Sequence, residues 1–360
     1  MPASPQPRKG RGAASNASGR FEQEERVAFD DGWSVPGCEP EPTPLDTILS
    51  VDATRTIIAR NDSPDIGFDR SINPYRGCEH GCIYCYARPS HAYLGLSPGL
   101  DFETRIFYKP QAAALLTAEL GKKGYACRPI ALGSNTDPYQ PAERKLGVTR
   151  SVLEVLREFR HPVTIVTKGA LIQRDIDILA EMAALRLACV TMSITSLDRS
   201  LARVMEPRAA TPERRLETVA ALAKAGIPTG VLAAPMIPAL NDAEMEDILA
   251  AAKDAGAVTA GYTMLRLPFE LKALFKEWLE AHFSMKAAHV LSLVAQSHGG
   301  KLYDSAWGKR MVGYGPYADM LGMRFDRAVR RLDLARRHSE PLDISLFRPP
   351  AKETKQLALF

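Results

Sequence analysis

Long hydrophobic runs are missing from this sequence of 360 residues. A transmembrane helix needs about 18 consecutive apolar residues, and no such run occurs. The first residues also lack the apolar core of a secretory signal peptide, so we expect a cytoplasmic protein. Charge of one sign is not in large excess either, because 46 Lys and Arg residues face 42 Asp and Glu residues. The resulting net charge of +4 permits contact with nucleic acid without requiring it.

Cysteine is scarce and unevenly distributed. Of six cysteines, Cys78, Cys82 and Cys85 fall together, whereas Cys38, Cys127 and Cys189 are scattered. This distribution does not match the disulfide framework of small secreted proteins. It indicates one metal site and a few unrelated thiols.

Composition divides the chain into four parts. Residues 1–45 are polar and rich in Pro, Gly and Ser, which predicts a disordered basic tail. We expect a core domain over residues 46–268, a helical extension over 269–340, and a linker ending in a distinct peptide over 341–360.

Short apolar runs alternate with helical patterns through the core. Strands are predicted at 128–133, 163–168, 187–194, 229–235 and 258–265, with one more just before the clustered cysteines. Helices are predicted at 109–122, 143–159, 172–185, 211–225 and 242–255. Such alternation predicts an α/β fold with a parallel sheet, either an incomplete barrel or an open doubly wound sheet. In both, ligands bind at the carboxyl ends of the strands.

The most informative stretch is NPYRGCEHGCIYCYAR at residues 73–88, with cysteines spaced C-x3-C-x2-C. Three thiolates on one short loop suit three corners of a [4Fe–4S] cluster, which leaves one iron open for a reactant. Gly77 and Gly81 suit a loop that wraps tightly. The alternatives are a zinc site with His80 or His91 as the fourth ligand, or three unrelated buried cysteines.

This spacing, with an aromatic residue before the third cysteine, resembles the radical S-adenosylmethionine (radical SAM) superfamily. The resemblance implies that Cys78, Cys82 and Cys85 hold the cluster and that the open iron binds S-adenosylmethionine. It implies reductive cleavage to a 5′-deoxyadenosyl radical, an electron donor such as flavodoxin or ferredoxin, and a partial (β/α)6 TIM barrel.

The longer pattern, with GSNTDPYQPAE at residues 133–143, most resembles the spore photoproduct lyase-like (DNA repair photolyase-like) branch. There, tyrosines matching Tyr84 and Tyr86 help relay the radical. A cysteine of that branch returns hydrogen to the product radical, and Ser134 occupies its position here. Because an O–H bond is much stronger than an S–H bond, we expect a different donor or a different substrate.

The resemblance also implies cofactor contacts at strand ends. The Ser134–Asp137 loop, including Asn135 and Thr136, would meet the amino end of the cofactor. Lys168 and Ser193 would meet its carboxylate, although strand ends often carry such residues without a ligand. Arg208 suits either a carboxylate clamp or a loop cap.

Two further segments bear on partners. The chain ends on Gln356, Leu357, Ala358, Leu359 and Phe360, which resembles the peptide that docks bacterial repair proteins on the sliding clamp. An apolar tail that packs on its own domain is the alternative. Residues 299–318 mix aromatic and cationic side chains, a combination that stacks bases but also packs ordinary barrel mouths: Tyr303, Trp307, Lys309, Arg310, Tyr314 and Tyr317.

Together these features predict a radical SAM enzyme that acts on damaged or modified DNA. One alternative is a radical SAM enzyme that modifies RNA, a peptide or a small metabolite. The other is a non-enzymatic metal-binding adaptor.

Overall fold

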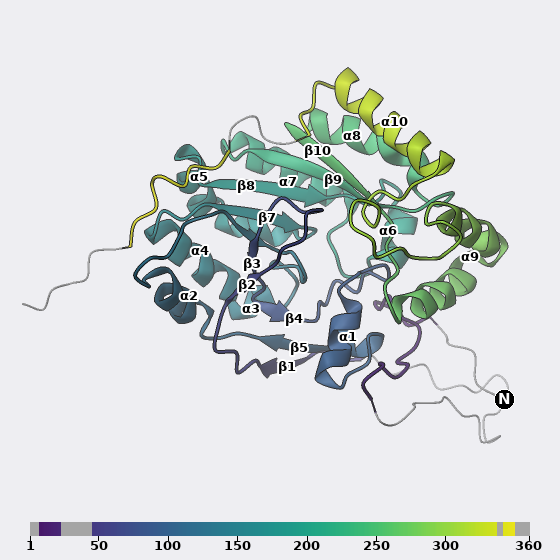
Figure 1. Cartoon of the computed structure of the whole chain (residues 1–360), viewed down its shortest axis with the longest axis horizontal. Coiled ribbons are helices and arrows are strands. Elements are labelled where there is room, and N and C mark those ends of the chain that lie inside the picture. Colours follow the sequence, from purple (N-terminus) through teal and green to yellow (C-terminus); the bar gives the residue numbers. More distant parts are fainter. Residues whose placement is uncertain (1–6, 23–44, 337–340, 350–360) are drawn as a thin grey trace, which may run out of the picture.

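The computed structural model describes residues 7–22, 45–336 and 341–349, and its centre is a seven-stranded sheet (Figure 1). The strand order is β10-β9-β8-β7-β6-β3-β2, and every neighbouring pair is parallel except β2 with β3. The strands are β2 (Ile58–Arg60), β3 (Arg70–Ile72), β6 (Ile130–Leu132), β7 (Val163–Thr167), β8 (Ala188–Ser193), β9 (Thr229–Met236) and β10 (Thr259–Met264).

The predicted parallel α/β fold is confirmed, and the strand before the cysteines is β3. Within the described residues the sheet edges β2 and β10 do not pair with each other, so the sheet is open between them. Helices connect the strands and cover the sheet: α2 (Ala112–Leu120), α3 (Glu143–Leu146), α4 (Val148–Glu158), η2 (Ala170–Asp175), α5 (Ile176–Ala184), α6 (Arg199–Met205), α7 (Pro212–Lys224), η3 (Asp242–Glu244) and α8 (Met245–Asp254).

A small second sheet, absent from the sequence prediction, contains the strand that directly precedes the cysteine loop. It has the order β1-β5-β4, with β1 (Ile48–Val51) parallel to β5 (Arg105–Tyr108) and β4 (Tyr75–Arg76) antiparallel to it. The segment η1 (Arg88–Leu94) and helix α1 (Leu100–Thr104) separate β4 from β5. The cysteines follow β4 directly, so this sheet fixes where their loop begins.

The helical extension consists of α9 (Leu271–Gln296) and α10 (Pro316–Arg331), joined by the α9–α10 loop, residues 297–315. Figure 1 shows α9 beyond the end toward which β7, β8 and β9 point. An apolar cluster that includes Ile83, Met205 and Trp278 packs α9 against the cysteine loop. None of the helices in the described ranges is long and apolar enough to cross a membrane.

Residues 7–22 do not behave as the disordered tail that was predicted. The backbone N–H groups of Gly12 and Ala13 donate to the Glu103 carboxylate at 3.0 and 2.9 Å. Arg20 forms an ion pair with Glu270 of the segment before α9 at 2.7 Å. The predicted disorder does not extend to these residues, because hydrogen bonds and an ion pair, rather than large apolar side chains, hold this segment to the core.

Part of the predicted C-terminal linker also packs on the core. Phe347 lies against Tyr125 and Phe159, with ring centroids 5.4 and 6.4 Å away. The remainder of both tails, including the peptide at residues 356–360, lies outside the described residues.

Candidate active site

The cysteine loop turns tightly at two glycines. Gly77 and Gly81 have φ angles of +77° and +68°, a region that favours glycine. A Cβ atom on Gly81 would also lie 2.8 Å from the Glu103 carboxylate. Cys78 and Cys82 are buried and Cys85 is partly buried, and all three are free thiols.

Arg88 holds the loop in shape from within the protein. Its side chain is fully buried, and its Nε and Nη2 donate to the carbonyls of Cys82 and Gly81 at 2.9 and 3.0 Å. Its charge is balanced by Glu103, which is also fully buried. A guanidinium suits this place because one planar group supplies five donors.

The two histidines of the zinc alternative have other partners. His91 Nε2 contacts the Arg105 carbonyl at 2.9 Å, and burial lowers the pKa of this imidazole to about 4. His80 Nδ1 lies 3.3 Å from the Asp137 carboxylate. Within the described residues, no three His, Cys, Asp or Glu side chains are grouped to hold a single metal ion.

The predicted Ser134–Asp137 loop reaches the cysteine loop through Asn73, a contact that sequence reasoning missed. Asn73 Oδ1 accepts from the backbone N–H of Asn135 at 2.9 Å, and its amide donates to Ser134 Oγ at 3.3 Å. Thr136 Oγ1 donates to the Tyr75 carbonyl at 2.8 Å. The Asn73 in NPYRGC therefore orders the loop after β6.

Asp137 faces protein groups. Its carboxylate accepts from Thr167 Oγ1 and the Lys168 N–H, each at 2.7 Å. Burial works to raise its pKa, but His80 and these donors lower it to about 2. Asp137 therefore ties the end of β7 to the loop after β6 and to the cysteine loop.

Lys168 and Ser193 meet at neighbouring strand ends, as their sequence positions suggest. Lys168 Nζ donates to Ser193 Oγ at 2.9 Å. The ammonium also lies 5.6 Å from the centre of the Tyr84 ring. This pair offers a cation and a hydroxyl together, which suits an anionic ligand.

A buried carboxylate behind Lys168, Glu206, escaped sequence reasoning. Its carboxylate accepts hydrogen bonds from the Tyr84 hydroxyl and from Thr195, and it forms an ion pair with Arg215. Lys168 Nζ lies 4.0 Å away. Burial raises the pKa of the Glu206 carboxyl, and the Arg215 guanidinium opposes that rise.

The two tyrosines beside Cys85 differ in environment. Tyr84 is buried against Glu206 and Thr195, whereas Tyr86 is 43% exposed and donates to the Ser134 carbonyl. The Arg266 guanidinium lies 4.7 Å from the centre of the Tyr86 ring. Tyr84 is therefore part of the wall and Tyr86 lies at the surface of the site.

Arg208 does not join Lys168 and Ser193. It pairs with Glu79 of the cysteine loop at 3.1 Å, and its backbone N–H donates to the His80 carbonyl at 3.2 Å. In this arrangement it supports the loop.

The thiols suit a metal cluster. Burial raises the pKa of all three, and the Lys168 charge opposes that rise at Cys82 and Cys85. Metal ligation removes such protons, and nearby cations balance the anionic thiolates that result. Three free thiols on one loop, with Lys168 as a neighbouring cation, therefore fit a [4Fe–4S] cluster, whose irons are held by thiolates.

Comparison with known proteins identifies the family. The sequence profile of the Radical SAM superfamily matches residues 72–252, which include the cysteine loop and the strands β6–β9. The chain belongs to the radical SAM superfamily. The cofactors that this family implies are a [4Fe–4S] cluster and S-adenosylmethionine.

Two relatives by sequence have no assigned function. An uncharacterized protein of Mycobacterium bovis is 36% identical over 214 residues, which are 59% of this chain and 63% of that protein. An uncharacterized protein of Methanocaldococcus jannaschii is 26% identical over 197 residues, covering 55% of this chain and 70% of that one. The match thus spans less than two thirds of the mycobacterial protein.

Solved structures of spore photoproduct lyase share the radical SAM fold of this chain. The complex with dinucleoside spore photoproduct has a TM-score of 0.58 at 16% identity and covers 79% of both chains. A doubly substituted mutant of the lyase, with bound AdoMet and the same lesion, has a TM-score of 0.57 at 15% identity. That match covers 79% of this chain and 78% of the mutant chain.

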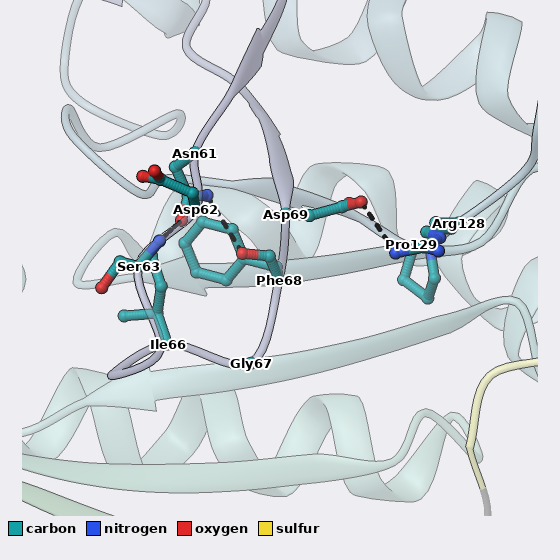
Figure 2. A pocket seen from close by; sticks show the side chains of 9 residues that line it. All are labelled: Asn61, Asp62, Ser63, Ile66, Gly67, Phe68, Asp69, Arg128 and Pro129. Atoms are coloured by element: carbon teal, nitrogen blue, oxygen red, sulfur yellow. Dashed lines mark hydrogen bonds and ion pairs between the residues drawn. The ribbon is translucent and has the colours of Figure 1, made fainter.

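A surface hollow is lined by residues of the β2–β3 turn, residues 61–69, and by Arg128 and Pro129. Figure 2 shows these side chains. Arg128 and Pro129 both precede β6, whereas Ser134 follows that strand, so the hollow lies at the amino end of β6.

Proposed function

We propose that this radical SAM enzyme acts on nucleic acid, and specifically on DNA that carries a damaged or modified base. The observation that supports this is the α9–α10 loop, where Trp307 is 59% exposed beside cationic Lys309. The loop crosses the end of β10, because the Met264 N–H donates to the Met311 carbonyl at 2.8 Å. An exposed aromatic ring with cations is a surface on which bases stack.

Each residue of the site has a proposed part. Cys78, Cys82 and Cys85 hold three irons, and the cofactors, when bound, supply a 5′-deoxyadenosyl radical that abstracts hydrogen. Lys168 and Ser193 bind the carboxylate of S-adenosylmethionine, and the Ser134–Asp137 loop lies toward its amino group. Tyr84 orders the wall, and Tyr86 faces the substrate.

The group that returns hydrogen to the product radical differs from the thiol that would act if a cysteine stood at position 134. Ser134 Oγ is hydrogen-bonded to Asn73. Outside the cysteine loop, the cysteines in the described ranges are Cys127 and Cys189, which precede β6 and open β8. Both lie toward the amino ends of the strands, so we propose a hydrogen donor other than a cysteine of this sheet.

The test is deuterium transfer. Anaerobically reconstituted enzyme with dithionite and S-adenosylmethionine is incubated with deuterated DNA pools, and 5′-deoxyadenosine is analysed by mass spectrometry. We expect deuterium from DNA, with C189A active and C82A inactive. Label from RNA alone would overturn the DNA assignment. Turnover only with peptides or metabolites would overturn the proposal that the substrate is a nucleic acid.

The sliding clamp stays a separate proposal that rests on the sequence of residues 356–360 alone. We expect a chain lacking Gln356–Phe360 to be lost from a clamp pull-down. Equal capture of both chains would contradict this partner.

A further inference from the structure

Arg266 places a positive charge beside the cysteine loop. It follows β10 closely, at the carboxyl end of the sheet where barrel ligands bind. Its guanidinium lies over Tyr86, the neighbour of Cys85. Arg266 is not among the residues assigned above to the cluster or to S-adenosylmethionine.

The hydrogen-bond donors of Arg266 lack strong acceptors. Its Nε is buried and has no hydrogen-bond partner, and its Nη1 contacts only the Met311 sulfur at 3.3 Å. A thioether is a weak acceptor. No ion pair of Arg266 occurs in the described part of the chain, in contrast with the paired Arg88, Arg215 and Arg310. A buried donor left unpaired is costly, so its retention calls for a ligand.

The nearby carboxylate is already engaged. Asp65 of the β2–β3 turn accepts from the Gly308 N–H at 2.6 Å and from Arg310 Nε at 2.5 Å. Arg310 forms the ion pair with Asp65, whereas Arg266 acts on this carboxylate without an ion pair, so the donors of Arg266 stay available. The same contacts fix the α9–α10 loop, with Trp307 directly before Gly308.

We propose that Arg266 binds a backbone phosphodiester of the substrate strand while Trp307 stacks on an adjacent base. This rests on the proposed function and specifies how nucleic acid would be held. A guanidinium matches phosphate because two parallel N–H groups can reach two oxygens. The proposed contact would place the strand over Tyr86, beside the cysteine loop.

The experiment measures binding of a fluorescent single-stranded DNA to the cluster-loaded enzyme at several salt concentrations. We expect R266M to weaken binding roughly tenfold to a hundredfold, the range for a hydrogen bond to a charged group. Its slope of log affinity against log salt should be smaller by about 0.7, the value for one phosphate on a single strand. R266K should retain most of the slope.

Arg128 provides the matched control. It lies at the amino end of β6, where it pairs with Asp69 at 3.2 Å (Figure 2), and R128M should bind like the wild type. Unchanged binding by R266M would overturn the role of Arg266 and leave the proposed function standing. Wild-type enzyme that binds no DNA would overturn both. The affinity for S-adenosylmethionine is measured in parallel, and a loss there with an unchanged salt slope would assign Arg266 to the cofactor and overturn the proposal.

Discussion

Single side chains at the carboxyl end of the sheet divide into those proposed to meet the cofactor and those that accept hydrogen bonds within the protein. Lys168 and Ser193 offer donors beside the cysteine loop. The carboxylates of Glu206 and Asp137 instead accept hydrogen bonds from protein donors. This division separates residues expected to affect cofactor affinity from residues expected to affect folding.

The Lys168 side chain gives the first prediction at this scale. K168M should weaken binding of S-adenosylmethionine roughly tenfold to a hundredfold, because a hydrogen bond to a charged group contributes about 1.5–3 kcal/mol. Equilibrium dialysis with the reconstituted protein measures it, and the affinity is expressed per cluster after iron analysis of each variant. The control K145M changes an exposed lysine of α3. Equal affinities in the two variants would contradict the assignment.

Sequence reasoning predicted that Lys168 and Ser193 lie close together because each stands at the carboxyl end of a strand, and the structure brings them within 2.9 Å of each other. It missed Glu206 and Arg266 for a physical reason. Glu206 contacts Tyr84 and Thr195, and Arg266 contacts Tyr86, across distances in sequence that no local pattern encodes. In the sequence alone, a Glu or Arg residue of this kind cannot be distinguished from a charged residue on the solvent-exposed surface.

Elements with strong local signals were predicted closely. The helix at 212–224 begins with Thr211, whose side chain accepts from the Arg214 N–H, and ends before Gly226 at φ +75°. The predicted helix over 143–159 is two helices, because Gly147 adopts φ +65° between them. The strands β1, β4 and β5 were missed because each is short. Pairing with neighbouring strands stabilises them, and a search for hydrophobic periodicity does not detect such pairing.

The segment 7–22 supports the cysteine loop and gives a prediction at the scale of elements. A Cβ on Gly12 would lie 1.8 Å from the Gly81 carbonyl, so G12A should displace the segment from the loop. We expect faster tryptic cleavage after Arg20 and faster loss of iron in air. Cleavage is followed by mass spectrometry and iron by absorbance.

Gly67 provides the control for this change. A Cβ there meets no atom within 4 Å, so G67A should behave like the wild type. Identical cleavage of G12A and G67A would show that the contact with Gly81 does not hold the segment.

The whole molecule should lose stability in mild acid because it buries neutral histidine. His161 lies between the Tyr125 hydroxyl at 2.9 Å and the Pro162 carbonyl at 3.0 Å. Burial lowers its pKa from 6.5 to about 4. Between these values the unfolded chain binds a proton that the folded chain does not. The free energy of unfolding should therefore fall as pH drops from about 6.5 to 4, by on the order of 3 kcal/mol for this group.

Urea unfolding across this pH range tests the assignment. H161Q should flatten the pH dependence, whereas H289Q, at an exposed position of α9, should not. An equally steep dependence in H161Q would contradict it. His91, whose pKa is also lowered to about 4, contributes in the same direction.

The contacts between segment 7–22 and α9 also set a sequence of events during biosynthesis. Ser15 Oγ donates to Glu277 of α9 at 2.7 Å, so the two ends of this support are made 262 residues apart. A ribosome releases Cys78–Cys85 long before it makes Glu277. The contact of Ser15 with Glu277 is therefore completed only after α9 has been made, whereas the contacts of Gly12 and Ala13 with Glu103 can form earlier.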